Sequence, residues 1–211
     1  FREHIIKDIT IQWKSYGSFV GSFNMLVYGI AIYLMSKIKK DESLSRGKIV
    51  FFFYFLGLSN LMFGWAHHTY LIPTLPWIRY VAYGASMTEW ILLGYIIYNW
   101  KRSLSKGDKQ LYPMAYKFLM ASDFWIFFNI FFALLISIPT INFFTHGTHI
   151  TVAHSMGTTI GINTSILFAS LFFITTKLNL SSIKNQLLLK RTYLLFNVSL
   201  FFFYVPYLLQ V

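Results

Sequence analysis

Residues 145–176 read THGTHITVAHSMGTTIGINTSILFASLFFITT, and this run holds no acidic or basic side chain apart from three histidines. One α-helix needs about 20 consecutive, mostly apolar residues to cross the hydrocarbon core of a bilayer. The run is long enough for such a helix, and no lysine, arginine or carboxylate interrupts it. It predicts a membrane-spanning helix with histidines near its first end.

Five other stretches are also long and mostly apolar, although 77–100 holds Arg79 and Glu89 and 112–138 holds Lys117 and Asp123. We therefore predict an all-α integral membrane protein with about six transmembrane helices. The expected spans cover residues 16–38, 49–68, 77–100, 112–138, 145–176 and 192–210. They form one domain over 16–211, and the charged segment 1–15 is expected at the outer face, leading into the first span. Only 12% of the residues are charged and none is cysteine, which excludes a soluble domain and thiolate metal sites.

The net charge of +11 would suit a nucleic-acid-binding surface, but the basic residues are placed as in a membrane protein. They cluster in short loops after the first, third and fifth spans, whereas the connections over 69–76 and 139–144 carry no charge. Cytoplasmic loops of membrane proteins are enriched in Lys and Arg. We therefore expect membrane lipid and no nucleic acid as a partner. We also expect a bacterial-type inner (cytoplasmic) membrane with the basic loops in the cytoplasm.

Five of the six histidines fall at one depth of this arrangement, near the outer face. His67 and His68 close the second span, and His146, His149 and His154 open the fifth. A lone histidine at a membrane interface is more often a polar surface residue than a ligand. A pair and a trio at one level instead favour metal binding, for which imidazole is the commonest ligand.

Two further side chains within the spans are candidates for chemistry. Glu89 lies near the middle of the third span, where a carboxylate is either a structural hydrogen-bonding group or a proton carrier. Met156 lies two residues after His154, about 200° around the helix, so the two side chains face opposite sides. A methionine alone is more often a packing residue than a ligand.

Two stretches of sequence carry a resemblance to a known family. The stretch Gly64-Trp-Ala-His-His-Thr-Tyr70, followed by Ser86-Met-Thr-Glu89, resembles the segment with a histidine pair and a later glutamate in nitric oxide reductase catalytic subunits. The stretch from Thr145-His-Gly-Thr-His to Ala153-His154 is similar to a second segment of those subunits, which belong to the haem-copper oxidase superfamily. The resemblance covers roughly residues 16–177 and corresponds to the C-terminal half of such a subunit, so we expect a fragment.

The resemblance implies a membrane-bound oxidoreductase that converts two NO to N2O and water at a centre of haem and a non-haem metal. It implies that His67 and His68 bind the non-haem metal, which is iron or copper, and that His154 is the ligand of a high-spin haem b. Glu89 would then supply protons, and His146 and His149 would lie by the haem propionates. Implied partners are an electron-donating cytochrome c subunit or quinol, and the missing N-terminal helices or a companion subunit.

The sequence departs from the family at three positions. Tyr16 stands where the family has a third metal-binding histidine, and Val20 where it has a glutamate. The phenol of Tyr16 could donate a hydrogen bond or bind the metal. Met156 stands where the family has the ligand of a second, low-spin haem, and a thioether can also bind such a haem. These departures leave open an oxygen reductase, an NO dismutase-like variant or a degenerate non-catalytic haem-binding protein. An ion or solute transporter, which only the intramembrane Glu89 and the broken spans support, comes last.

Overall fold

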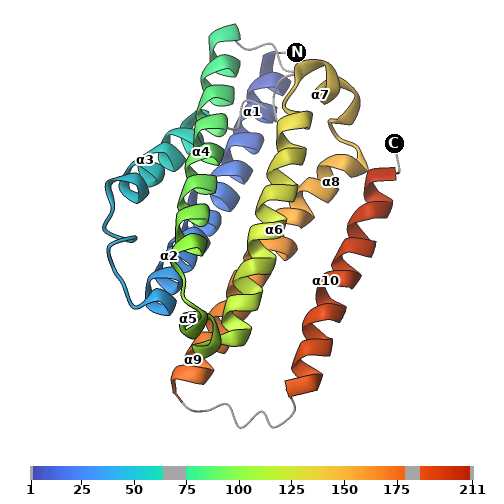
Figure 1. Ribbon diagram of the computed structural model, residues 1–211. Helices are drawn as coiled ribbons and strands as arrows, with labels where there is room; N and C mark the ends of the chain where they lie inside the picture. Colours follow the sequence, from blue (N-terminus) through green and yellow to red (C-terminus); the bar gives the residue numbers. More distant parts are fainter. Residues whose placement is uncertain (1, 64–74, 179–185, 210–211) are drawn as a thin grey trace.

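The computed structural model describes residues 2–63, 75–178 and 186–209, and in these ranges it contains helices and no strand (Figure 1). In chain order the elements are α1 (Arg2–Tyr16), the π-helix η1 (Gly17–Asn24), α2 (Met25–Lys39), α3 (Lys48–Phe63), α4 (Pro76–Ser103), α5 (Lys106–Leu111), α6 (Pro113–Ile136), α7 (Pro139–Thr145), α8 (His149–Met156), the π-helix η3 (Gly157–Thr164), α9 (Ser165–Lys177) and α10 (Gln186–Leu209). The prediction of an all-α protein is confirmed.

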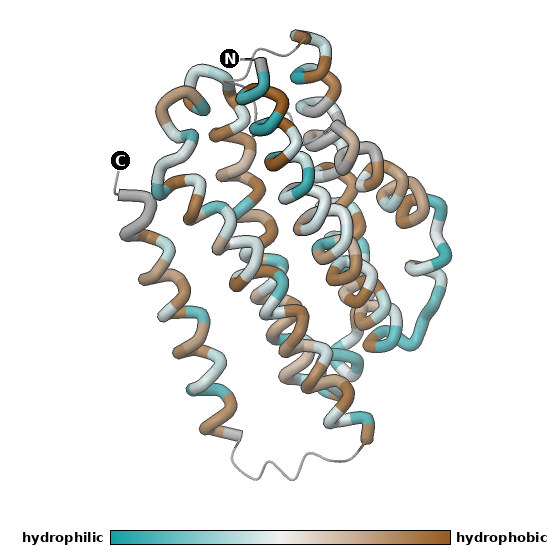
Figure 2. Tube along the Cα trace, turned by 180° about the vertical axis from the view of Figure 1, so that it is seen from behind, coloured by the Kyte–Doolittle hydropathy of each residue, from teal (hydrophilic) through white to brown (hydrophobic). Residues whose placement is uncertain are grey.

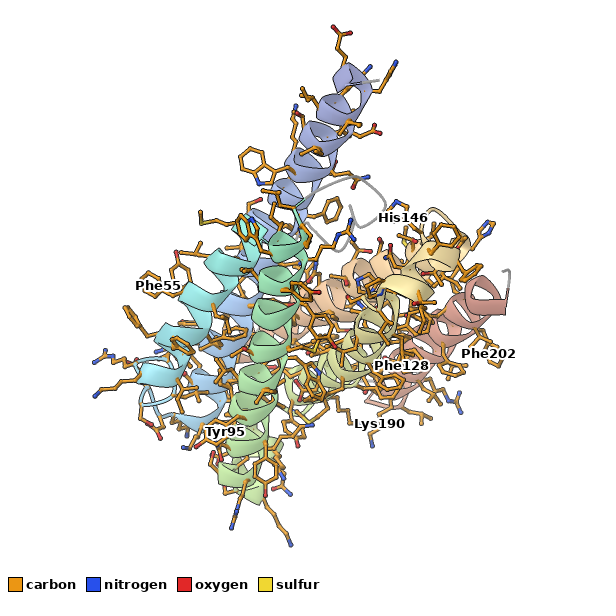
Figure 3. The ribbon with its side chains drawn as sticks, turned by 90° about the horizontal axis from the view of Figure 1, so that it is seen from above. Phe55, Tyr95, Phe128, His146, Lys190 and Phe202 are labelled. Carbon is orange, nitrogen blue, oxygen red and sulfur yellow. The ribbon has the colours of Figure 1, made fainter. Side chains whose placement is uncertain are left out.

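Among the described residues, four helical stretches are long and apolar enough to cross a membrane. They are Glu3–Lys39, Pro113–Ile136, His149–Lys177 and Leu187–Val205. A shorter apolar helix covers Lys48–Leu58, and α4 carries Arg79 and Glu89 within its 28 residues. Large apolar side chains face outward along the bundle; Phe55 and Phe202, for example, point away from it on opposite sides (Figure 3). An apolar exterior of this kind suits lipid rather than water.

The core forms around α6, which packs against η3 and α9, while α3 packs against α4 and α10 against α8. The indoles of Trp125 in α6 and Trp100 in α4 are almost completely buried, as is the phenol of Tyr204 in α10. The Trp100 indole nitrogen donates a hydrogen bond of 2.9 Å to the main-chain oxygen of Met35 and so ties α4 to α2. Aromatic side chains therefore supply much of the contact between helices.

Two of the long helices contain an eight-residue π-helical segment, η1 and η3, and each segment begins at a glycine. The segments meet in the bundle, where the Asn163 amide nitrogen donates a buried hydrogen bond of 2.9 Å to the Asn24 amide oxygen. Polar side chains that bond across helices hold membrane bundles together because lipid offers them no partner. The bond thus fixes the first and fifth expected spans to each other.

Replacing Asn163 with leucine is expected to lower the free energy of unfolding by about 1 kcal/mol, because it removes the bond and leaves the Asn24 amide unpaired. Unfolding by a denaturing detergent, followed by circular dichroism, measures the change. The double variant Asn24→Leu/Asn163→Leu should recover part of the loss. If the two single losses add fully in the double variant, the two amides do not interact.

The C-terminal ends of α2, α4 and α9 and the start of α10 lie at one end of the bundle, and α7 lies at the other end (Figure 1). The loop between α2 and α3 is a hydrophilic stretch, as Figure 2 shows, and ion pairs order it. Its Glu42 carboxylate binds the Lys37 ammonium at 2.9 Å and the Arg46 guanidinium at 2.7 Å. The hydrogen bond from Lys37 lowers the pKa of Glu42, so this side chain keeps its charge at neutral pH.

Residues 2–15, which were expected to lead into the first span, lie in α1, and α1, η1 and α2 run on as one helix from Arg2 to Lys39. The structure differs from the expected spans at the start of the fifth. The helix expected from Thr145 begins at His149. Gly147 has a φ of 73°, which is not a helical conformation, so it separates α7 from α8. Thr148 caps α8 by accepting a hydrogen bond of 3.3 Å from the Ile150 amide.

Candidate functional site

His154 lies in the last turn of α8, just before the π-helical segment η3. Its side chain is partly buried, and within the described part of the chain its Nδ1 atom is buried without a hydrogen-bond partner. Leaving a buried polar atom unpaired costs about 1–3 kcal/mol. A metal ion bound at Nδ1 itself would offset that cost, so this imidazole is the best-supported ligand candidate among the described residues.

A chain of polar groups connects α6 to the turn that follows His154. The Asn129 amide nitrogen donates a hydrogen bond of 2.6 Å to the Thr158 hydroxyl. The Thr158 hydroxyl in turn donates a hydrogen bond of 3.4 Å to the main-chain oxygen of His154. On the other side, the Tyr204 hydroxyl donates to the Asn129 amide oxygen at 3.4 Å. Three elements, α6, η3 and α10, therefore meet at one buried amide next to the candidate ligand.

Two glycines of η3 make this close packing possible. A Cβ atom on Gly157 would lie 2.5 Å from the Asn129 amide oxygen, and one on Gly161 would lie 2.7 Å from the Trp125 ring. Both distances are far shorter than ordinary carbon contacts. The glycines thus let α6 approach the backbone of the helix that carries His154, and π-helical segments often occur at functional sites.

The other histidines of this region are not gathered around His154. His146 ends α7 and is partly buried, and it lies near the rim in the view of Figure 3. His149 begins α8 and is exposed. Met156 is partly buried, and its sulfur lies 3.9 Å from the Thr159 hydroxyl one turn further on. Within residues 2–63, 75–178 and 186–209, no three His, Asp or Glu side chains form a group that could hold a metal.

The remaining predicted site residues are not covered by the structure. His67 and His68 lie outside the described residues. Tyr16 is the last residue of α1 and Glu89 lies within α4, but the side chains of both are outside the described part. The predicted second metal site and proton donor therefore stay predictions.

Two polar features of the bundle were not predicted from sequence. Asn129 was missed, although a buried amide in an apolar span is itself a signal for a contact between helices. The buried carboxylate of Asp123 in α6 forms an ion pair of 3.2 Å with the ammonium of Lys101, which lies in the last turn of α4. This ion pair lies on a different part of α6 from Asn129 and joins two helices there.

Comparison with protein families identifies the chain. Residues 5–210 match the family described as Cytochrome C and Quinol oxidase polypeptide I. The chain belongs to this family. The match confirms the haem-copper oxidase superfamily that the two histidine-bearing stretches indicated, and it covers almost the whole sequence. Neither the curated proteins nor the solved structures give a match to the chain.

Membership of the Cytochrome C and Quinol oxidase polypeptide I family gives the coarse function. Together with the apolar helices, it makes the chain an integral membrane protein of the haem-copper oxidoreductase class. Subunits of this family work with other subunits in a membrane and bind haem and a further metal. His154 fits a haem ligand, because its ring is largely withdrawn from solvent and presents a nitrogen that no described protein group satisfies.

Proposed function

We propose that the chain forms part of a nitric oxide reductase-like catalytic subunit, which reduces two NO molecules with two electrons and two protons to N2O and water. The observation that carries the proposal is the buried, unpaired imidazole nitrogen of His154 at the end of a stretch similar to the haem-binding segment of those subunits. The family match supports an oxidoreductase with haem and a second metal. The glutamate that follows Ser86 by three residues favours NO over oxygen as the substrate.

The residues of the chain take distinct roles in this proposal. His154 holds a high-spin haem b, and His67 and His68 hold non-haem iron or copper. When bound, the two metals supply electrons and binding positions for NO. Glu89 delivers the two protons that form the product water, one after the other, and Tyr16 takes the place of a third metal-binding histidine.

Three further groups belong to the surroundings of the haem. His146 follows α7 and His149 begins α8, on either side of Gly147. Their proposed role is to contact the haem propionates. Met156 is the candidate ligand for a second, low-spin haem that would pass electrons to the site. A cytochrome c subunit or quinol would supply these electrons. The outer face of an inner membrane is the proposed place of the metals, with the basic loops in the cytoplasm.

The experiment that tests the proposal measures gas turnover and cofactor content together. The protein is purified from membranes in detergent with the subunits that accompany it, and haem, iron and copper are quantified per chain. Consumption of NO with production of N2O, together with haem and one non-haem metal, would support the reductase. Consumption of oxygen without NO turnover, or conversion of NO to N2 and O2, would replace it with an oxygen reductase or a dismutase.

A second candidate is favoured by Tyr16 and Val20, which stand where the family has a metal-binding histidine and a glutamate. These two replacements would weaken the second metal site. The chain would then bind haem in the membrane without reducing NO. Haem at His154 with no non-haem metal and no turnover of either gas would establish this function in place of the first.

Replacing His67 or His68 with alanine is expected to remove the non-haem metal and to lower NO turnover by more than ~100-fold, since each removes a direct ligand. The haem spectrum should stay as in the unaltered protein, because His154 is untouched. Metal analysis and a NO electrode measure the two effects. Retention of both the metal and NO consumption would reject the assignment of the histidine pair.

A further inference from the structure

The side chain of Asn129 is 2% exposed and uses both ends of its amide. The amide nitrogen donates to the Thr158 hydroxyl at 2.6 Å, and the amide oxygen accepts from the Tyr204 hydroxyl at 3.4 Å. A leucine of similar size would fill the space but could form neither bond. Losing either hydrogen bond of a buried amide costs free energy, because no water can replace the lost partner. The Asn129 amide therefore holds the helices that carry its two partners in position.

This amide lies against the part of the backbone that carries His154. The Thr158 hydroxyl reaches back to the main-chain oxygen of His154, and Gly157 leaves the room that the Asn129 amide oxygen occupies. The segment after the imidazole is therefore held from α6 through the side chain of one residue.

We propose that Asn129 is a positioning residue, whose side-chain amide sets the direction in which His154 presents its ring to the haem iron. The inference rests on the proposed function, in which His154 is the haem ligand. Groups outside the first ligand shell orient a metal-binding histidine and change metal affinity about 10–100-fold when they are removed. The bond from Asn129 to Thr158 acts on the turn directly after the ligand, and η3 has no regular α-helical hydrogen bonding to hold that turn by itself.

The test compares Asn129→Leu with two milder variants. Asn129→Asp keeps an acceptor for Tyr204 but loses the amide donor, and Thr158→Val removes the hydroxyl that the amide contacts. The readouts are the iron–histidine stretching band in resonance Raman spectra of the reduced protein, the haem midpoint potential and the affinity for haem. Asn129→Leu is expected to shift the band and the potential, and to weaken haem binding about 10-fold or more. Thr158→Val should shift the band in the same direction by less.

Asn197→Leu is the matched control. Asn197 in α10 has an amide that accepts from the Trp125 indole at 3.4 Å and donates to the Tyr193 main chain, away from the turn after His154. The Asn197→Leu variant should leave the iron–histidine band unchanged even if it lowers the stability of the protein. The inference would be overturned if Asn129→Leu kept the wild-type iron–histidine band and haem potential. If that variant does not fold, wild-type values in both Asn129→Asp and Thr158→Val would overturn it. Retention of the high-spin haem signal in His154→Ala would overturn the proposed function instead.

Discussion

His154→Ala is expected to abolish haem binding at the proposed high-spin site and with it all NO reduction. The imidazole is the ligand that the sequence and the structure both support, and its buried Nδ1 has no hydrogen-bond partner in the described part of the chain. Loss of a direct ligand should lower the occupancy of the high-spin haem by at least ~10-fold, beyond the effect of any positioning residue, while a low-spin haem at Met156 would stay. The high-spin bands of the visible spectrum, with pyridine haemochrome analysis of haem per chain, measure this loss, and circular dichroism shows whether the helices still form.

His4→Ala provides the matched control for this experiment. His4 is exposed on α1, and no role is proposed for it. The control should keep the haem spectrum and turnover of the unaltered protein, so that a loss in His154→Ala reflects the position and not the removal of any imidazole. An unchanged haem spectrum in His154→Ala would show that the ligand is another residue.

The largest expected effect on stability comes from a single methyl group at Gly161. A Cβ atom there would lie 2.7 Å from two ring atoms of Trp125 and 3.0 Å from its Cβ atom. The Trp125 side chain is 1% exposed and packed by α6, η3 and α10, so it has no room to move aside. We expect Gly161→Ala to lower the free energy of unfolding by about 1–3 kcal/mol and Gly161→Val to prevent folding.

Gly29→Ala gives the comparison that isolates this clash. Gly29 lies within α2, and a Cβ atom there would meet nothing within 4 Å. Because alanine favours a helix over glycine by about 1 kcal/mol, this variant should be as stable as the unaltered protein or more so. Detergent-induced unfolding followed by circular dichroism measures both variants. Equal stability of Gly161→Ala and Gly29→Ala would mean that η3 and α6 are not in close contact.

The helices could be read from the sequence because charge and hydropathy decide where a chain can cross a membrane. The apolar runs over 112–138 and 145–176 correspond closely to α6 and to the helix from His149 to Lys177. The family was also within reach, because the two histidine-bearing stretches are specific and the match over 5–210 confirmed the superfamily. The nitric oxide reductase activity within that superfamily stays a proposal.

Other features could not be predicted from the sequence, because they depend on contacts between distant residues or on the backbone conformation of single residues. Charges before residue 16 set the start of the first predicted span, and hydropathy could not show that the same helix extends back to Arg2 through backbone hydrogen bonds. The apolar pattern gave no sign that Gly147 would turn the chain before α8. The pairing of Asp123 with Lys101 and of Asn129 with Thr158 joins residues 22 and 29 positions apart, which spacing along one helix cannot reveal.

The wide turns over Gly157–Thr164 have a consequence for how this helix should be interpreted or redesigned. Each π turn holds about one residue more than an α turn, so the angular position of every later side chain is displaced from a count of 3.6 residues per turn. A face drawn by that count from His154 into α9 would assign inward and outward positions incorrectly. Gain or loss of one residue inside the segment would rotate the imidazole against the other half of its own helix.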